Sequence, residues 1–290
     1  MNALSDAIQR LLDSPAALPS SSFSLQQRKA LETFSSSTRL IEIARQGRST
    51  LYRVINPLAL SNYLAQLQPV SETDLPPDLP DRSRNVGINR SSKKGNSTHQ
   101  SYYLLMKAWA DGVIWQDERT TLDVTAATSK FGIAALRLNA DQSWRCNRTL
   151  LFVENQALFD RNDWLDNDFN GCLIYYAGQL PEFFLQWLSE CSRSPQVILF
   201  PDYDGIGLSN YARLAKSLHA ETKLDFYWMP NWQDKLMKYG DKEIWSRTSI
   251  LFHNAYNQLK LSNLVDKDLE QLAEISQYHG KALEQEAIWL

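Results

Sequence analysis

Two aspartates, Asp202 and Asp204, stand one residue apart where an apolar run meets a glycine and a helix-like pattern, in ILFPDYDGIGL (198–208). A third acid, Glu154, ends the apolar run TLLFVEN. Side chains two apart on an extended segment point the same way, so the two aspartates can face one site. Clustered carboxylates raise one another's pKa unless a cation neutralises them, and hard oxygen ligands suit Mg²⁺ or Mn²⁺. The pattern predicts a divalent-metal site at Glu154, Asp202 and Asp204, although each acid alone could be a strand or helix cap, Asp204 especially.

The segments that would position these acids alternate between strand and helix patterns. Apolar strand-like runs occupy 149–155, 171–178, 195–204 and 223–230, and helical patterns occupy 181–191 and 205–219. This alternation predicts an α/β fold with a mostly parallel, Rossmann-like sheet covered on both faces. In such sheets functional groups collect at the carboxyl ends of the strands, which is where the three acids fall. We expect one domain over 149–290, with a mainly helical C-terminal extension.

The N-terminal half has a different pattern. Helical patterns at 5–13, 25–34, 37–47 and 57–67 surround a strand-like segment at 48–56. This order predicts a winged-helix-like α+β region over 1–70. Residues 71–148 are interpreted as a linker with a basic loop (82–99), a helix (101–110) and a mixture of short strands and turns.

Charge is distributed unevenly along the chain. Residues 1–150 contain 18 Lys and Arg against 13 Asp and Glu, or +5, so the net charge of −3 leaves −8 for residues 151–290. A basic half beside an acidic half suits a DNA-holding part beside a metal-holding part, with chance asymmetry as the alternative. The cations that we expect to contact phosphate, unless they are simply solvated, are Arg48, Arg53, Arg82, Arg84, Arg90, Lys93 and Lys94.

Several other classes of protein are disfavoured. No apolar run approaches the roughly 20 residues of a membrane helix, and no secretion signal opens the chain, so we expect a cytoplasmic protein without membrane contact. The three cysteines and four histidines lack zinc-ligand spacing. No P-loop sequence is present, so any ATPase would be on another chain.

Glu154 follows the first strand, Gly178 lies in the loop after the second, and the D-x-D pair of Asp202 and Asp204 follows the third. This part of the sequence resembles a Toprim domain. The resemblance covers roughly residues 149–230. A closer similarity is to the topoisomerase VI A-subunit-like branch, and within it to the nuclease subunit of Wadjet-type, condensin-linked plasmid defence systems. The turn FPDYDGIGL and the ending KALEQEAIWL (281–290) carry that similarity. The chain is shorter than that nuclease family, and its N-terminal half matches only vaguely.

The resemblance implies a Mg²⁺- or Mn²⁺-dependent endonuclease that cleaves double-stranded DNA with Glu154, Asp202 and Asp204. It also implies a homodimer and an SMC/kleisin-type ATPase complex as partner, in anti-plasmid or anti-phage defence. Glu284 and Glu286 in the matched ending are further candidate metal ligands.

Two alternatives use the same fold. In a topoisomerase-like transesterase a tyrosine attacks the phosphodiester, and the candidate nucleophiles are Tyr52 and Tyr103, with Tyr102 beside the latter. Tyr52 could equally be a core aromatic. In a non-catalytic DNA-binding adaptor the Toprim-like part would be purely structural. We prefer hydrolysis by a metal-bound water, because strand passage would require an ATPase that this chain lacks.

Overall fold

A computed structural model of the 290-residue chain describes residues 3–47, 49–67, 75–93, 95, 101–161, 163–166 and 168–290. The chain forms two compact units, residues 1–98 and 99–290, and each has a hydrophobic core of its own. Among the described residues, no helix is both long and apolar enough to cross a membrane.

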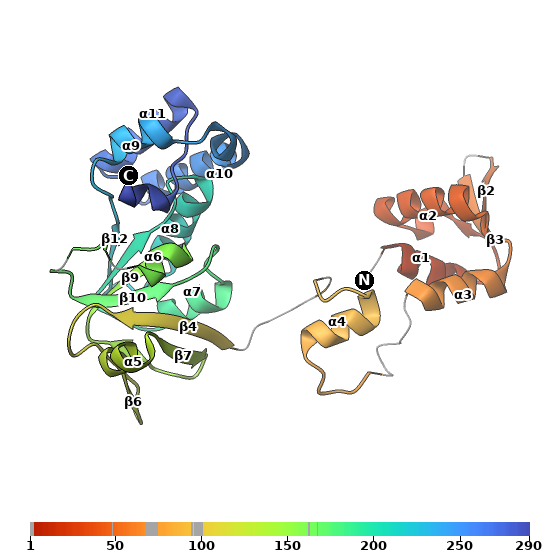
Figure 1. Ribbon diagram of the computed structural model, residues 1–290. Coiled ribbons are helices and arrows are strands. Elements are labelled where there is room, and N and C mark those ends of the chain that lie inside the picture. The colour runs from red at the N-terminus through yellow and green to blue at the C-terminus, as the bar shows by residue number, and fades with distance from the viewer. Residues whose placement is uncertain are drawn as a thin grey trace. The chain divides into compact units, whose positions relative to one another are not determined.

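The first unit packs helices against a small antiparallel sheet of strand order β1-β3-β2 (Figure 1). Its core is formed by buried apolar side chains of α1, α2, α3 and the hairpin strands, among them Ile8, Leu31 and Tyr52. Its elements are α1 (Ala3–Leu12), β1 (Leu18–Pro19), a 3₁₀ turn (Ser20–Ser22), α2 (Leu25–Thr38), β2 (Ile41–Gln46), β3 (Ser49–Val54), α3 (Pro57–Leu67) and α4 (Asp81–Asn89).

Two predictions for this unit were wrong. The helix predicted over 37–47 is absent, because α2 ends at Thr38 and β2 follows, pairing along its whole length with β3. Arg39, in the left-handed region at φ 56°, stops the helix, and the first side chains of β2 alternate between buried and exposed from Ile41 to Ile43, as a strand requires. The basic loop predicted over 82–99 instead begins as helix α4, which contains Arg82 and Arg84.

The second unit is built on a six-stranded sheet of order β12-β11-β9-β10-β4-β7. The four strands from β12 to β10 run parallel, while β4 and β7 join antiparallel. The fold is therefore mixed α/β with a mostly parallel sheet, as predicted. Its strands are β4 (Ser101–Ala108), β7 (Ala134–Asn139), β9 (Thr149–Val153), β10 (Gly171–Tyr175), β11 (Gln196–Phe200) and β12 (Lys223–Phe226), and a second small sheet holds β5 (Ile114–Gln116), β6 (Thr121–Asp123) and β8 (Arg145–Cys146).

Helices connect these strands and cover the sheet. The chain moves one way along the sheet from β9 to β10 and the opposite way from β10 to β11. Because crossovers between parallel strands are right-handed, the two connecting helices, α6 and α7, are expected on opposite faces of the sheet. Figure 1 shows α9, α10 and α11 gathered with the C-terminus at one end of this unit. The helices are α5 (Val124–Phe131), α6 (Gln156–Asp160), α7 (Glu182–Ser189), α8 (Gly205–Ser217), α9 (Trp232–Tyr239), α10 (Lys242–Leu261) and α11 (Lys267–His279), followed by a 3₁₀ turn, η3 (Gln285–Trp289).

The helix predicted over 101–110 is strand β4. Leu104 and Met106 are fully buried, whereas Tyr103 before them is exposed and Leu105 between them is only half-buried, which is the period of two that a strand requires. Residues 101–148, assigned from the sequence to a linker region, thus contribute β4 and β7 to the main sheet. The predicted strands that carry the acids are confirmed as β9 and β11, and the predicted helix after Asp204 is confirmed as α8.

We predict that Gly205→Ala destabilises the second unit. Gly205 opens α8 against α10, and an added Cβ would lie 2.0 Å from the Thr248 carbonyl oxygen and 2.8 Å from the Phe252 nitrogen. Both are backbone atoms that cannot turn aside, so we expect a loss of about 1–3 kcal/mol in unfolding free energy. Ile206→Ala on the exposed side of the same helix should cost about 0.5 kcal/mol or less. Urea denaturation that ranks the two variants equally would contradict this packing.

Candidate functional site

The sheet has a topological switch point between β9 and β11. The connection leaving β9 leads to β10 on one side, and the connection leaving β11 leads to β12 on the other. Open α/β sheets bind ligands at the carboxyl ends of strands whose outgoing connections diverge in this way, and this place is called the crevice below. Val153 pairs with Phe200 at the end of the ladder. Glu154 is the residue after Val153 and Asp202 is two residues after Phe200, so the register brings both acids to this crevice.

The C-terminal segment lies against the loop that carries Asp202. Tyr203 and Leu283 form an antiparallel bridge, with the Tyr203 N–H donating to the Leu283 carbonyl at 2.7 Å and the Leu283 N–H donating back at 3.2 Å. This pairing places residues 284–286 beside the acids, although they are some 80 positions further along the chain. The backbone N–H of Gln285 then donates to Asp202 Oδ1 at 2.8 Å.

Gln285 is fully buried and joins both strand ends through its side chain. Its amide nitrogen donates to the Phe200 carbonyl at the end of β11. Its amide oxygen accepts from the Asn155 N–H, just after Glu154, at 3.1 Å. The Asn155 side-chain amide in turn donates to the Glu286 carboxylate. Hydrogen bonds from the C-terminal segment, made by Gln285 and Glu286, therefore fix the ends of β9 and β11 to each other.

Burial and mutual repulsion act on Glu154 and Asp202. Burial and then the nearby Glu154 together raise the pKa of Asp202 to about 8, while the Gln285 N–H opposes the shift. Burial likewise raises the pKa of Glu154 to about 7, with smaller contributions from Asp204 and Glu286. Glu154 and Asp202 both lie within the electrostatic influence of Asp204 and Glu286, and these four carboxylates are called the carboxylate cluster below.

Asp204 also has a structural role. It is 5% exposed and is the N-cap of α8, with its Oδ1 accepting from the Gly207 N–H at 2.8 Å. Burial raises the pKa of its carboxyl. The role as a helix cap that the sequence suggested for Asp204 is therefore confirmed. The charge of Asp204 also raises the pKa of Glu154 and of Asp202.

The two C-terminal glutamates differ in position. Glu286 is half-buried and held by Asn155, whereas Glu284 is exposed. The pKa of Glu284 is raised by burial of its carboxyl and then by Glu286, Asp241 and Asp204. Glu286 is therefore the better placed of the two to join Glu154 and Asp202.

The donor set fits a hard divalent cation. The cluster offers only carboxylate oxygens, and across the described residues no salt bridge joins a lysine or arginine to any of its members. The described side chains do not bring three or more His, Cys, Asp or Glu groups to metal-binding spacing. A cation would therefore have to draw the carboxylates together by side-chain rotation, and Glu154, Asp202 and Glu286 would hold it, with Asp204 beside them.

The cations predicted to contact DNA lie in the first unit, apart from Arg48 and Lys94, which fall outside the described residues. Arg53 is on β3 and Arg82 on α4, and both are exposed. Arg84 is half-buried and donates to the Pro77 carbonyl at 3.0 Å. Arg90, at the C-cap of α4, and Lys93 are exposed.

The candidate tyrosine nucleophiles differ in accessibility. Tyr52 is 1% exposed and packs edge-on against Phe23, with its pKa raised by burial, which is the environment of a core aromatic. Tyr102 stacks on Phe184, with ring centroids 5.0 Å apart. Tyr103, on the opposite face of β4, is 63% exposed.

Three polar residues of the site were missed in the sequence. Asn155 and Gln285 are described above, and Tyr176 donates its hydroxyl hydrogen to Glu154 Oε2 at 3.0 Å. Asn155 directly follows Glu154 and Gln285 lies between Glu284 and Glu286, so a position next to a candidate acid was the available signal for these two, whereas Tyr176 had no such signal. Their contacts join segments up to 131 positions apart, which no local pattern encodes.

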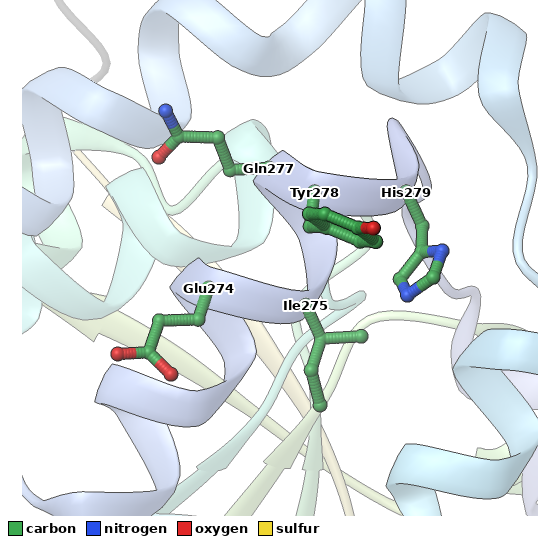
Figure 2. A pocket seen from close by; sticks show the side chains of 5 residues that line it. All are labelled: Glu274, Ile275, Gln277, Tyr278 and His279. Carbon is green, nitrogen blue, oxygen red and sulfur yellow. The ribbon is translucent and has the colours of Figure 1, made fainter.

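The second unit also has a broad surface hollow against α11. Figure 2 shows the side chains that line it, Glu274, Ile275, Gln277, Tyr278 and His279. All come from one helix, and none belongs to the carboxylate cluster. Its lining includes one acid, Glu274, and no group of carboxylates, so it is the weaker candidate for a metal-dependent reaction centre.

Comparison with known proteins adds no identity. No protein-family model matches the chain, and no curated protein matches it. Function is therefore inferred from the geometry and chemistry of the crevice.

We predict that metal-free protein loses stability as pH rises from about 5 to 8. The unfolded chain releases the protons of Glu154 and Asp202 near pH 4, whereas the folded protein holds them until about pH 7 and 8. The folded state thus binds more protons across this window, so the unfolding free energy falls with pH. In EDTA the melting temperature should drop by a few degrees, and Asp202→Asn should flatten the slope. Asp141→Asn, an exposed acid outside the cluster, should leave it unchanged. Equal slopes for wild type and Asp202→Asn would contradict the account.

Proposed function

We propose that the protein is a metal-dependent DNA endonuclease with Toprim-type chemistry, serving as the nuclease subunit of an SMC/condensin-like anti-plasmid or anti-phage complex. The observation that carries the proposal is that Glu154, Asp202 and Glu286 lie at one sheet switch point, close enough for Glu154 and Glu286 to raise the pKa of Asp202, without a basic partner among the described residues. The order of glutamate, glycine loop and D-x-D along the strands supports the Toprim assignment. The similarity of the C-terminal ending supports the defence role, the homodimer and the ATPase partner.

The roles of the chain's own residues follow from their environment. Bound Mg²⁺ or Mn²⁺ would polarise the scissile phosphate and supply an activated water. Glu154, Asp202 and Glu286 would hold the cation, and the cation would in turn allow Glu154 and Asp202 to ionise fully at neutral pH. Asp204 would keep α8 in place while adding negative potential. The exposed cations Arg53, Arg82, Arg90 and Lys93 would hold the DNA backbone, with Arg84, Arg48 and Lys94 as further candidates.

We predict that Asp202→Asn and Glu154→Gln each lower Mg²⁺-dependent plasmid cleavage at least about 100-fold, because removing a ligand forfeits several kcal/mol of charge stabilisation. Nicking and linearisation on agarose gels, with Mg²⁺ or Mn²⁺, measure the loss. Asp141→Asn is the matched control and should cut at the wild-type rate. Cleavage that survives Asp202→Asn would contradict the proposed site.

Two other results would redirect the function. Salt-sensitive DNA binding without cleavage under either metal would favour the non-catalytic adaptor. A protein–DNA adduct that persists after denaturation would favour the tyrosine transesterase. Tyr103 is then the accessible nucleophile, and Tyr103→Phe should abolish the adduct.

We predict that the exposed cations of the first unit set the salt dependence of DNA binding. Each phosphate contact contributes roughly 0.9 to the slope of log affinity against log salt concentration. The double variant Arg53→Ala, Arg82→Ala should therefore reduce the slope by about 2. Lys260→Ala, an exposed cation in the second unit, should leave it unchanged. Fluorescence anisotropy with a labelled duplex at several salt concentrations measures the slope, and an unaltered slope in the double variant would contradict this assignment.

A further inference from the structure

Tyr176 is attached to the end of β9 by both its backbone and its side chain. Its N–H donates to the Val153 carbonyl at 3.1 Å, and its hydroxyl donates to Glu154 Oε2 at 3.0 Å. The side chain is 2% exposed, so water cannot readily replace either bond. One buried tyrosine thus fixes the backbone before Glu154 and one of its two carboxylate oxygens.

The turn that follows Tyr176 is fixed to the helix capped by Asp204. Ala177 and Gly178 both have positive φ, 52° and 96°, and turn the chain away from β10. The Asn210 side chain, 1% exposed on α8, donates to the Gly178 carbonyl at 3.1 Å and accepts from the Leu180 N–H at 3.2 Å. The position of the tyrosine is therefore coupled to α8, the element that carries a second member of the cluster.

The tyrosine hydroxyl is a permanent donor to Glu154. A tyrosine hydroxyl has an ordinary pKa of about 10, so near neutral pH it keeps its proton and can donate it to the Glu154 carboxylate. A donor that occupies Oε2 restricts rotation of the carboxylate and leaves Oε1 free of this bond. Partners of this kind orient metal ligands, and their loss typically weakens metal binding 10- to 100-fold.

We infer that Tyr176 is a positioning residue for the divalent cation, holding the Glu154 carboxylate in the orientation in which Oε1 binds the metal. This inference rests on the proposed function. It adds Tyr176 to the residues of the metal site, although Tyr176 is not part of the strand-end motif. Tyr176 does not touch the substrate; it acts through Glu154. Its removal should raise the metal concentration needed for half-maximal activity more than it lowers the rate at saturating metal.

The test is Mn²⁺ binding to the full chain, followed by the electron paramagnetic resonance signal of free Mn²⁺. Tyr176→Phe removes one hydroxyl and keeps the buried ring, and we expect its Mn²⁺ dissociation constant to rise about 10- to 100-fold. Tyr175→Phe is the matched control. That ring stacks on Phe159, with centroids 5.5 Å apart, and the variant should bind as wild type does.

The outcomes separate the two proposals. Wild type that binds no Mn²⁺ would overturn the metal site itself, and this inference with it. Wild-type affinity in Tyr176→Phe, with binding lost in Asp202→Asn, would overturn the inference and leave the site standing. Thermal melts of both tyrosine variants check that they are folded. The second readout is the Mn²⁺ concentration that gives half-maximal cleavage. It should rise in Tyr176→Phe and stay at the wild-type value in Tyr175→Phe.

Discussion

The free-energy cost of placing like charges together in a buried crevice is the constraint on which the site depends. Glu154 and Asp202 follow adjacent parallel strands, and burial together with mutual repulsion moves their pKa values to about 7 and 8. At neutral pH the two carboxyl groups are therefore partly protonated, because ionising both would place two repelling charges side by side. Hydrogen bonds from Tyr176 and from the Gln285 backbone offset only part of this cost. A divalent cation would remove the remainder, and the lack of a basic partner among the described residues is the reason for proposing a metal site here.

The fold concentrates distant segments at this one place. Parallel pairing of β9 and β11 brings the first two acids to the same edge of the sheet, and the change in connection direction between these strands makes that edge the switch point. The C-terminal segment then closes it through the Tyr203–Leu283 bridge and the buried Gln285 side chain. Asp204 links the crevice to α8, whose close approach to α10 depends on Gly205. The ending of the chain is thus part of the site, and its glutamine is held more tightly than the glutamates on either side.

The sequence predicted the parallel strands of the second unit well, because buried parallel strands appear as continuous apolar runs. The acids that directly follow these runs could therefore be recognised as lying at strand ends. It failed where local propensity and tertiary context disagree. The segment from Ser101 was interpreted as a helix, yet its alternation of buried and exposed residues is completed only by pairing with β10 and β7. The segment from Ile41 became a strand because β3 pairs with it. At the site, Glu154, Asp202 and Asp204 could be named from motif alone. Tyr176 and Gln285 could not, because their roles exist only once strands and C-terminus meet.

The most direct measurement of the central claim is the position of a bound cation in crystals of the protein grown with Mn²⁺, located by anomalous scattering. The account predicts a single strong peak between the strand ends, within about 2.5 Å of carboxylate oxygens of Glu154 and Asp202, with Glu286 turned toward it. A crevice that stays free of Mn²⁺ at millimolar concentration, or that is filled by a lysine or arginine side chain, would contradict it.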